Sequence, residues 1–351
     1  MRLSRLFALA ALVAAAGAAP TMVPAQPAAT AACTPGAKLQ FICGVRNPED
    51  LVQIPRSDWI IGSGLSVANA PGTGGLIIID GKTRTATKAV LQLGGPAQKP
   101  FDACPGPVDP TRFSAHGLNL LAQGRGRLFV VGHGAREAIE VFSISQPRGR
   151  PPQLQWIGCI PAPQGANFNS VAALSDGRII ATDFYHAPLT MGDALAGRNT
   201  GAVYSWKPGG AFQKLPGTDL PGPNGVEVTP DKRYLFVAVT GSSSTMRYEL
   251  ADTTKPPAVI KTDFRTDNLR WGQDGRLLLA GPGADPACRP GPGVRCPMAS
   301  VVGALDARTM KLDILLQTAE PAFQGLSSAL IVGKTLWLGS YTADRAAYTS
   351  L

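Results

Sequence analysis

The feature that most constrains this chain is a short pattern that recurs along its length. Residues 223–240, PNGVEVTPDKRYLFVAVT, combine two apolar runs with a turn at Thr229-Pro230-Asp231, as in a β-hairpin. Related hairpins occupy residues 116–133, 169–183 and 267–281, and looser copies occupy residues 49–62 and 327–339. Six such units, about 40 to 70 residues apart, predict an all-β, six-bladed β-propeller. Residues 346–351 are expected to supply the outer strand of the last unit.

The first 32 residues have the layout of an export signal and a linker. Arg2 and Arg5 precede an apolar, Ala-rich stretch over residues 6–19, and small residues follow, as in secretory signal peptides. We therefore expect a signal peptide and disordered linker over residues 1–32, and export to the periplasm or out of the cell. Residues 33–351 are expected to form one propeller domain.

Composition argues against several classes of partner. Beyond the leader, no apolar run reaches the roughly 20 residues that a transmembrane helix needs, so no membrane span is expected. The net charge is +9, but the Lys and Arg residues are dispersed and do not cluster with aromatic residues. This pattern argues against nucleic acid as a partner. We expect a monomer that acts on a small molecule.

Six cysteines in an exported chain predict disulfide bonds. Cys288 and Cys296 flank a Pro/Gly-rich loop and are the first expected pair. The remaining expected pairs are Cys33 with Cys43 and Cys104 with Cys159, although spacing alone leaves other pairings open. A zinc site is the alternative, but the chain has no C-x-x-C motif and no His near a Cys.

Polar residues stand at the start of the innermost strand in five of the six units. In a propeller these starts meet at one end of a central channel. The residues are Glu49, His116, Asn169, Asn224 and the pair Asp267-Asn268. Two carboxylates and three amide oxygens suit a hard divalent cation, and their charge balances that of Ca²⁺. Turn formation would explain a single member such as Asn224, whereas the whole set indicates a metal site.

The three histidines of the chain all fall near this end of the channel. His116 begins the inner strand of the second unit and His133 ends the strand that returns beside it, so the hairpin brings both to one face. His186 follows the equivalent return strand of the third unit, just after Asp183 and Tyr185. We predict that His186, Asp183 and Tyr185, with the long loop that contains them, shape a substrate pocket.

At these residues the chain resembles the paraoxonase and gluconolactonase (senescence-marker-like) superfamily of calcium-dependent six-bladed propellers. Motifs such as His116-Gly117-Leu118 and Pro223-Asn224-Gly225-Val226 carry the resemblance. It implies that His116 and His133 form a histidine pair used in the hydrolysis of lactones and esters. The calcium ligands that it implies are Glu49, Asn169, Asn224, Asp267 and Asn268. The resemblance thus implies a calcium-dependent lactonase or arylesterase.

The chain departs from this family at a second, structural calcium. That site uses the residue matching Asp50, a main-chain carbonyl near Leu118, and an Asp where this chain has Ser170. We therefore predict a single tightly bound calcium, and a second site only after Ser170→Asp. The carboxylate of Asp50 should then be satisfied by solvent, a nearby donor or a cation such as Arg, because an unpaired buried charge is costly.

Two other functions fit the same fold. A calcium-stabilised propeller that only binds a small molecule or a protein would not need His116 and His133 in register. A strictosidine-synthase-like enzyme would not need the metal ligand set. The chain has no G-x-S-x-G motif, which argues against a serine hydrolase.

Overall fold

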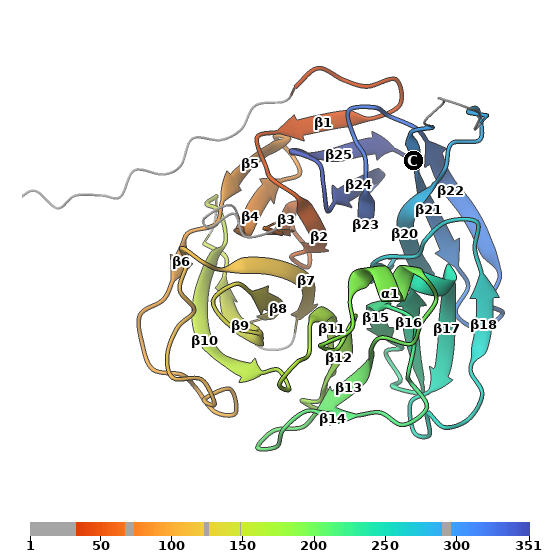
Figure 1. Ribbon diagram of the computed structural model, residues 1–351. Coiled ribbons are helices and arrows are strands. Elements are labelled where there is room, and N and C mark those ends of the chain that lie inside the picture. The colour runs from red at the N-terminus through yellow and green to blue at the C-terminus, as the bar shows by residue number, and fades with distance from the viewer. Residues whose placement is uncertain (1–32, 67–73, 123–125, 148, 290–295) are drawn as a thin grey trace, which may run out of the picture.

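The computed structural model describes residues 33–66, 74–122, 126–147, 149–289 and 296–351. The expected signal peptide and linker lie outside the described residues. Six sheets form a ring (Figure 1), so the all-β, six-bladed β-propeller predicted from the sequence is confirmed. No helix in the described ranges is long and apolar enough to cross a membrane.

The sheets are named here from the inner strand outward. The first three blades are β2 (Pro48–Gln53), β3 (Trp59–Gly64), β4 (Gly75–Asp80) and β5 (Thr85–Lys88); β7 (Ser114–Leu121), β8 (Arg127–His133), β9 (Ala138–Ser145), β10 (Gln153–Pro161) and β6 (Leu91–Gln92); and β11 (Phe168–Ala173), β12 (Ile179–Asp183), β13 (Ala202–Trp206) and β14 (Gln213–Lys214). The last three are β15 (Pro223–Val228), β16 (Tyr234–Val239), β17 (Ser244–Glu249) and β18 (Ala258–Lys261); β19 (Leu269–Trp271), β20 (Leu277–Ala284), β21 (Met298–Leu305) and β22 (Leu312–Thr318); and β23 (Leu326–Val332), β24 (Thr335–Ser340), β25 (Arg345–Ser350) and β1 (Gln40–Cys43).

The ring is closed by pairing the two ends of the described chain. The C-terminal strand β25 is the third strand of blade six, not the outer strand that we expected. The outer strand is β1, which runs antiparallel to β25 with Phe41 opposite Ala347 (Figure 1). Glu320 fixes the segment before β1 by accepting hydrogen bonds from the backbone N–H groups of Ala37 (3.2 Å) and Lys38 (2.6 Å).

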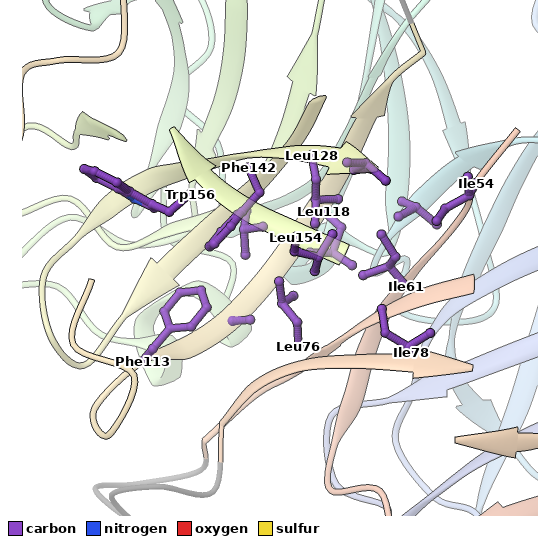
Figure 2. Packing of buried hydrophobic residues seen from close by; sticks show 14 of the residues in the cluster. Ile54, Ile61, Leu76, Ile78, Phe113, Leu118, Leu128, Phe142, Leu154 and Trp156 are labelled. Atoms are coloured by element: carbon purple, nitrogen blue, oxygen red, sulfur yellow. The ribbon is translucent and has the colours of Figure 1, made fainter. Parts of the chain in front are cut away.

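The apolar core lies mainly between neighbouring blades. Figure 2 shows the cluster between blades one and two, where Ile61 and Ile78 from one sheet pack with Leu118, Leu128 and the other residues of the second sheet. The sequences of these strands are almost continuously apolar, because the adjacent blades cover both faces of each sheet. This packing holds the inner strands at fixed positions around the channel.

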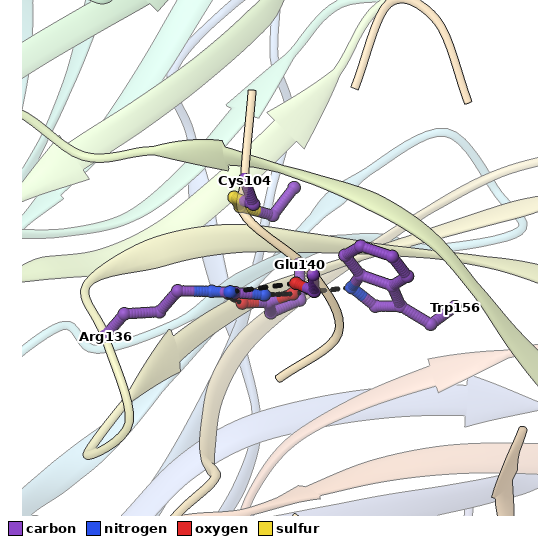
Figure 3. The surroundings of a disulfide bond; sticks show 6 residues. Cys104, Arg136, Glu140 and Trp156 are labelled. Carbon is purple, nitrogen blue, oxygen red and sulfur yellow. Dashed lines mark hydrogen bonds and ion pairs between the residues drawn. A yellow bond between two sulfur atoms is a disulfide. The ribbon is translucent and has the colours of Figure 1, made fainter. Parts of the chain in front are cut away.

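The three predicted disulfides are confirmed: Cys33–Cys43, Cys104–Cys159 and Cys288–Cys296. Cys104–Cys159 joins the loop between β6 and β7 to β10 (Figure 3). Beside it, the buried carboxylate of Glu140 accepts hydrogen bonds from Arg136 (Nε, 2.6 Å) and from Trp156 (Nε1, 2.7 Å). Three disulfides are typical of proteins from oxidising, extracytoplasmic compartments.

Candidate metal centre and active site

Backbone irregularities place four of the predicted site residues. The pairing of inner strands with their neighbours shifts register at the same place in blades one to four. Glu49, His116, Asn169 and Asn224 lie within these shifts. Such bulges turn a side chain away from the normal alternation of a strand. All four side chains line one cavity at the end of the channel.

Two glycines let the inner strands approach one another at this level. A Cβ atom on Gly117 would lie 2.3 Å from the carbonyl oxygen of Asn169, and one on Gly225 would lie 2.5 Å from that of Asp267. Gly225 has no positive φ, so the Asn-Gly pair of blade four serves close backbone contact. The hairpin turn itself lies further along, between β15 and β16.

Several buried acceptor oxygens in the predicted ligand set have no protein partner among the described residues. They are Glu49 Oε2, Asn169 Oδ1, Asn224 Oδ1 and Asn268 Oδ1. The amide nitrogens, in contrast, are held: Asn268 Nδ2 donates to Glu49 Oε1 (2.6 Å), and Asn224 Nδ2 donates to Thr240 Oγ1 (3.1 Å). Since buried polar atoms are normally satisfied, these oxygens are oriented for a group that the protein itself does not supply.

The negative charges of Glu49 and Asp267 would also be stabilised by a bound cation. Burial, together with the negative charges of Asp267 and Asp50, raises the pKa of Glu49 well above its usual value. Burial likewise raises the pKa of Asp267 to about 8. Two buried carboxylates that repel each other are stabilised by a divalent cation, which restores their charged forms.

The residues therefore fit a hard cation such as Ca²⁺. Oxygen-only ligation by carboxylates and amide carbonyls is the set that calcium prefers. In the described part of the chain, no three His, Cys, Asp or Glu side chains are grouped as a metal site. The candidate site consequently depends on its three Asn residues, a composition that suits neither zinc nor other softer metals.

His116 and His133 form the first part of a hydrogen-bonded chain. The Nδ1 atom of His116 lies 3.0 Å from Nε2 of His133, and Nδ1 of His133 lies 2.7 Å from Oε2 of Glu137. This row of hydrogen bonds ends beside the proposed metal ligands, because His116 Nε2 lies 3.8 Å from Glu49 Oε1 and 3.5 Å from Asn169 Nδ2. The two histidines thus lie where the hairpin argument places them.

The hydrogen bonds from His116 to His133 and from His133 to Glu137 determine which ring nitrogens of the two histidines carry protons. A carboxylate can only accept, so Glu137 holds a proton on Nδ1 of His133. Nε2 of His133 then accepts from Nδ1–H of His116, so His116 Nε2 is an acceptor, and Asn169 Nδ2 donates to it over a long 3.5 Å. Burial, followed by the neighbouring His133, lowers the pKa of His116 well below its usual value. His116 is therefore neutral at pH 7 and able to accept a proton.

The cavity above this cluster has a volume of about 1110 Å³. The loop after β12 forms part of its wall and contains a short helix, α1 (Met191–Leu195), which Thr190 caps. Phe184, Tyr185, Met191 and Leu195 line the cavity. The walls are largely apolar, as is usual for a small-molecule site.

Asp183 and His186 do not line this cavity. The fully buried Asp183 accepts a hydrogen bond from the backbone N–H of Asn167 (2.8 Å), and its other oxygen lies 2.7 Å from His186 Nδ1. The ring of His186 packs over Gly165. The pair ties the loop before β11 to the loop after β12, and any role in binding substrate stays a prediction.

A buried arginine occupies the centre of the ring beside the cluster. Arg270 Nη2 donates to both carboxylate oxygens of Asp50 (2.8 Å each) and to the carbonyl oxygen of Leu118 (3.0 Å). Its Nη1 donates to Glu227 (3.2 Å), whose pKa burial raises to about 7. The prediction that a cation such as Arg satisfies Asp50 is confirmed.

Sequence reasoning missed Glu137 and Arg270. Glu137 follows His133 by four residues, and an acidic residue shortly after a candidate catalytic histidine is a weak signal that we did not use. Arg270 follows Asn268 within the fifth repeat, where an apolar inner strand was expected. No local pattern indicates that its side chain turns into the channel.

Comparison with known proteins identifies the class of fold. No protein-family profile and no curated protein sequence matches this chain. A luciferin-regenerating enzyme has a similar structure, with 12% identity, a TM-score of 0.56, and coverage of 88% of this chain and 93% of the other. A protein provisionally named a gluconolactonase is 18% identical, with a TM-score of 0.52, and the match covers 88% of this chain and 90% of the other.

A third similar structure is regucalcin from Agrobacterium tumefaciens, described as a calcium-binding protein. It has 13% identity and a TM-score of 0.51, and the match covers 90% of this chain and 94% of that one. These three structures share the fold of this chain, so the expected resemblance is confirmed at the level of the fold. Identities this low do not establish the activity of this chain.

Proposed function

We propose that this protein is a calcium-dependent hydrolase of lactones or related aryl esters. The observation that carries the proposal is the placement of His116. Its Nε2 lone pair accepts only a long hydrogen bond from Asn169 Nδ2 and lies beside buried carboxylate and amide oxygens that have no partner among the described residues and suit calcium. The fold shared with a protein named as a gluconolactonase and with calcium-binding regucalcin supports it.

The chain's own groups would act as follows. Glu49, Asn169, Asn224, Asp267 and Asn268 would hold the ion. Bound calcium would supply positive charge that polarises the substrate carbonyl and stabilises the oxyanion. His116 Nε2 would accept a proton from the attacking water as the oxygen–carbon bond forms. The same nitrogen would return the proton to the leaving oxygen as the ester bond breaks.

His133 and Glu137 would act through His116. When His116 takes up a proton, its Nδ1–H still donates to His133, and the hydrogen bond from His133 to Glu137 keeps that acceptor in the correct tautomer. Glu137 is the more exposed end of this row of hydrogen bonds, with 37% of its side chain accessible to solvent. It offers a route for proton exchange with solvent.

Replacing His116 with Gln should lower the turnover of aryl esters and lactones by roughly 10² to 10⁴, the usual contribution of a general base. Calcium affinity should change little, because His116 is not one of the proposed ligands. Turnover of purified protein, with calcium binding measured by titration calorimetry, tests this expectation.

His186→Gln is the matched control. His186 also pairs with a buried carboxylate, but it does not line the cavity, so its replacement should leave turnover within about threefold of wild type. Wild-type turnover in the His116 variant would overturn the proposed base. A protein that binds calcium and small molecules but hydrolyses nothing would favour a non-catalytic propeller.

The compartment and the oligomeric state belong to the same proposal. The three disulfides agree with export, and we propose a periplasmic or secreted enzyme. It would act as a monomer on a small-molecule lactone or ester, with no nucleic-acid partner.

A further inference from the structure

The cavity wall opposite the histidine pair carries two polar groups that the proposed chemistry does not use. Arg265 precedes Asp267 by two residues at the entrance to blade five, and Tyr341 follows β24 in blade six. Both residues line the cavity. His116 and His133 belong to blade two, which lies across the ring from blade five (Figure 1). A substrate held at the proposed calcium can therefore extend away from His116 towards Arg265.

The backbone on this wall is firmly held. The N–H of Arg265 donates to the carbonyl oxygen of Pro282 (3.0 Å). The N–H of Tyr341 donates to the carbonyl oxygen of Gly325 (3.1 Å), and a Cβ atom on Gly325 would lie 3.1 Å from Cζ of the Tyr341 ring. The glycine thus lets the phenol ring approach the backbone closely.

The side-chain donors on this wall are uncommitted. Within the described part of the chain, neither the guanidinium of Arg265 nor the hydroxyl of Tyr341 makes a side-chain hydrogen bond or ion pair. Asp263 lies on the same wall but forms no ion pair with Arg265 among the described contacts. Arg112, the other cavity arginine, donates to the carbonyl oxygen of Gly134 (2.8 Å). Arg265 is therefore a cavity guanidinium whose donors are all available to a ligand.

We propose that Arg265 and Tyr341 form a subsite for a carboxylate carried by the substrate, remote from the bond that is cleaved. A planar guanidinium and a phenol both donate, and the partner that accepts from both most strongly is an anionic carboxylate. The phenol of Tyr341 is protonated at neutral pH and can therefore donate. The inference rests on the proposed function and narrows the substrate class to lactones or esters that bear a carboxylate.

Hydrolysis of 4-carboxyphenyl acetate and of phenyl acetate tests the subsite. The preference for the charged ester, as the ratio of the two kcat/KM values, should fall about tenfold in Arg265→Gln, because hydrogen bonds to charged groups are the strong ones. Tyr341→Phe should lower the same ratio by a smaller factor. Arg308→Gln is the control for net charge, because Arg308 lies outside the cavity lining, and it should leave the ratio unchanged. An equal loss on both esters in Arg265→Gln would overturn the subsite.

Binding separates this inference from the proposed hydrolysis. Phenylacetate should bind the calcium-loaded wild type at least about tenfold more tightly than Arg265→Gln, measured by calorimetry. A carboxylate held by the calcium alone would bind both proteins equally, and that result would overturn the subsite. If wild type cleaves neither ester, the proposed hydrolase fails, while the phenylacetate comparison still decides whether the subsite exists.

Discussion

Chelating calcium should abolish hydrolysis by this protein. It should also lower the melting temperature by about 5 °C relative to protein in calcium at one hundred times its Kd. Without the ion, the buried oxygens of Glu49 and the three Asn residues have no partner among the described residues, and the raised pKa values of Glu49 and Asp267 reflect the cost of keeping both carboxylates charged. A cation that binds only the folded state stabilises it by linkage. Activity and differential scanning calorimetry in EGTA and in calcium give both quantities.

The Glu49→Gln variant separates loss of the ion from a side effect of the chelator. This change removes one of the two facing carboxylates and so weakens calcium binding, but it also relieves their repulsion. The variant in EGTA should be at least as stable as wild type in EGTA, and calcium should stabilise it much less. Full wild-type activity in EGTA after dialysis would contradict the calcium site.

The sequence predicted which polar residues lie together at the end of the channel, because these residues occupy equivalent positions in a repeated unit. Glu49, Asn169 and Asn224 each begin an inner strand, and the propeller geometry brings the starts of these strands together. The Cys288–Cys296 pair was also predictable, because the two residues flank one short loop, whereas the spacing of the other four cysteines left their pairing open. In such cases the local sequence pattern and the repeated geometry of the fold predict the same positions for the residues.

What the sequence did not predict depends on contacts across the ring. Arg270 and Asp50 lie 220 residues apart, and an Arg inside a strand normally points to solvent. The outer strand of blade six is four residues long, QFIC, which is too short for a periodic signal. His186 was expected in the pocket from its place after a strand, but the direction of its side chain depends on the buried Asp183.

Arg270 changes what is expected of a second metal site. Its guanidinium already binds the carboxylate of Asp50 and the carbonyl of Leu118, the groups that we expected from the sequence at a second calcium. Ser170→Asp alone should therefore not create that site, contrary to the expectation from the sequence. The added carboxylate would instead face a position that an arginine already neutralises.

Replacing Arg270 with Met should destabilise the protein by about 3 to 5 kcal/mol, the typical cost of removing one partner from a buried ion pair. Asp50 is fully buried and the Glu227 side chain is 8% exposed, so neither carboxylate can reach bulk water. Denaturant unfolding in EGTA measures the loss. Arg270→Met combined with Glu227→Gln should recover part of it, because only one carboxylate is then left without a cation.

The same variant should gain affinity for calcium. With the guanidinium gone, Asp50, Glu227 and the Leu118 carbonyl present an oxygen set to the channel, and adding Ser170→Asp contributes a further carboxylate. Elemental analysis should find one calcium per chain in wild type and in Ser170→Asp, and two in Arg270→Met/Ser170→Asp.

Two equivalents in wild type would show that Arg270 does not replace an ion. A wild-type unfolding free energy in Arg270→Met would show that its contacts with Asp50 and Glu227 add nothing to stability.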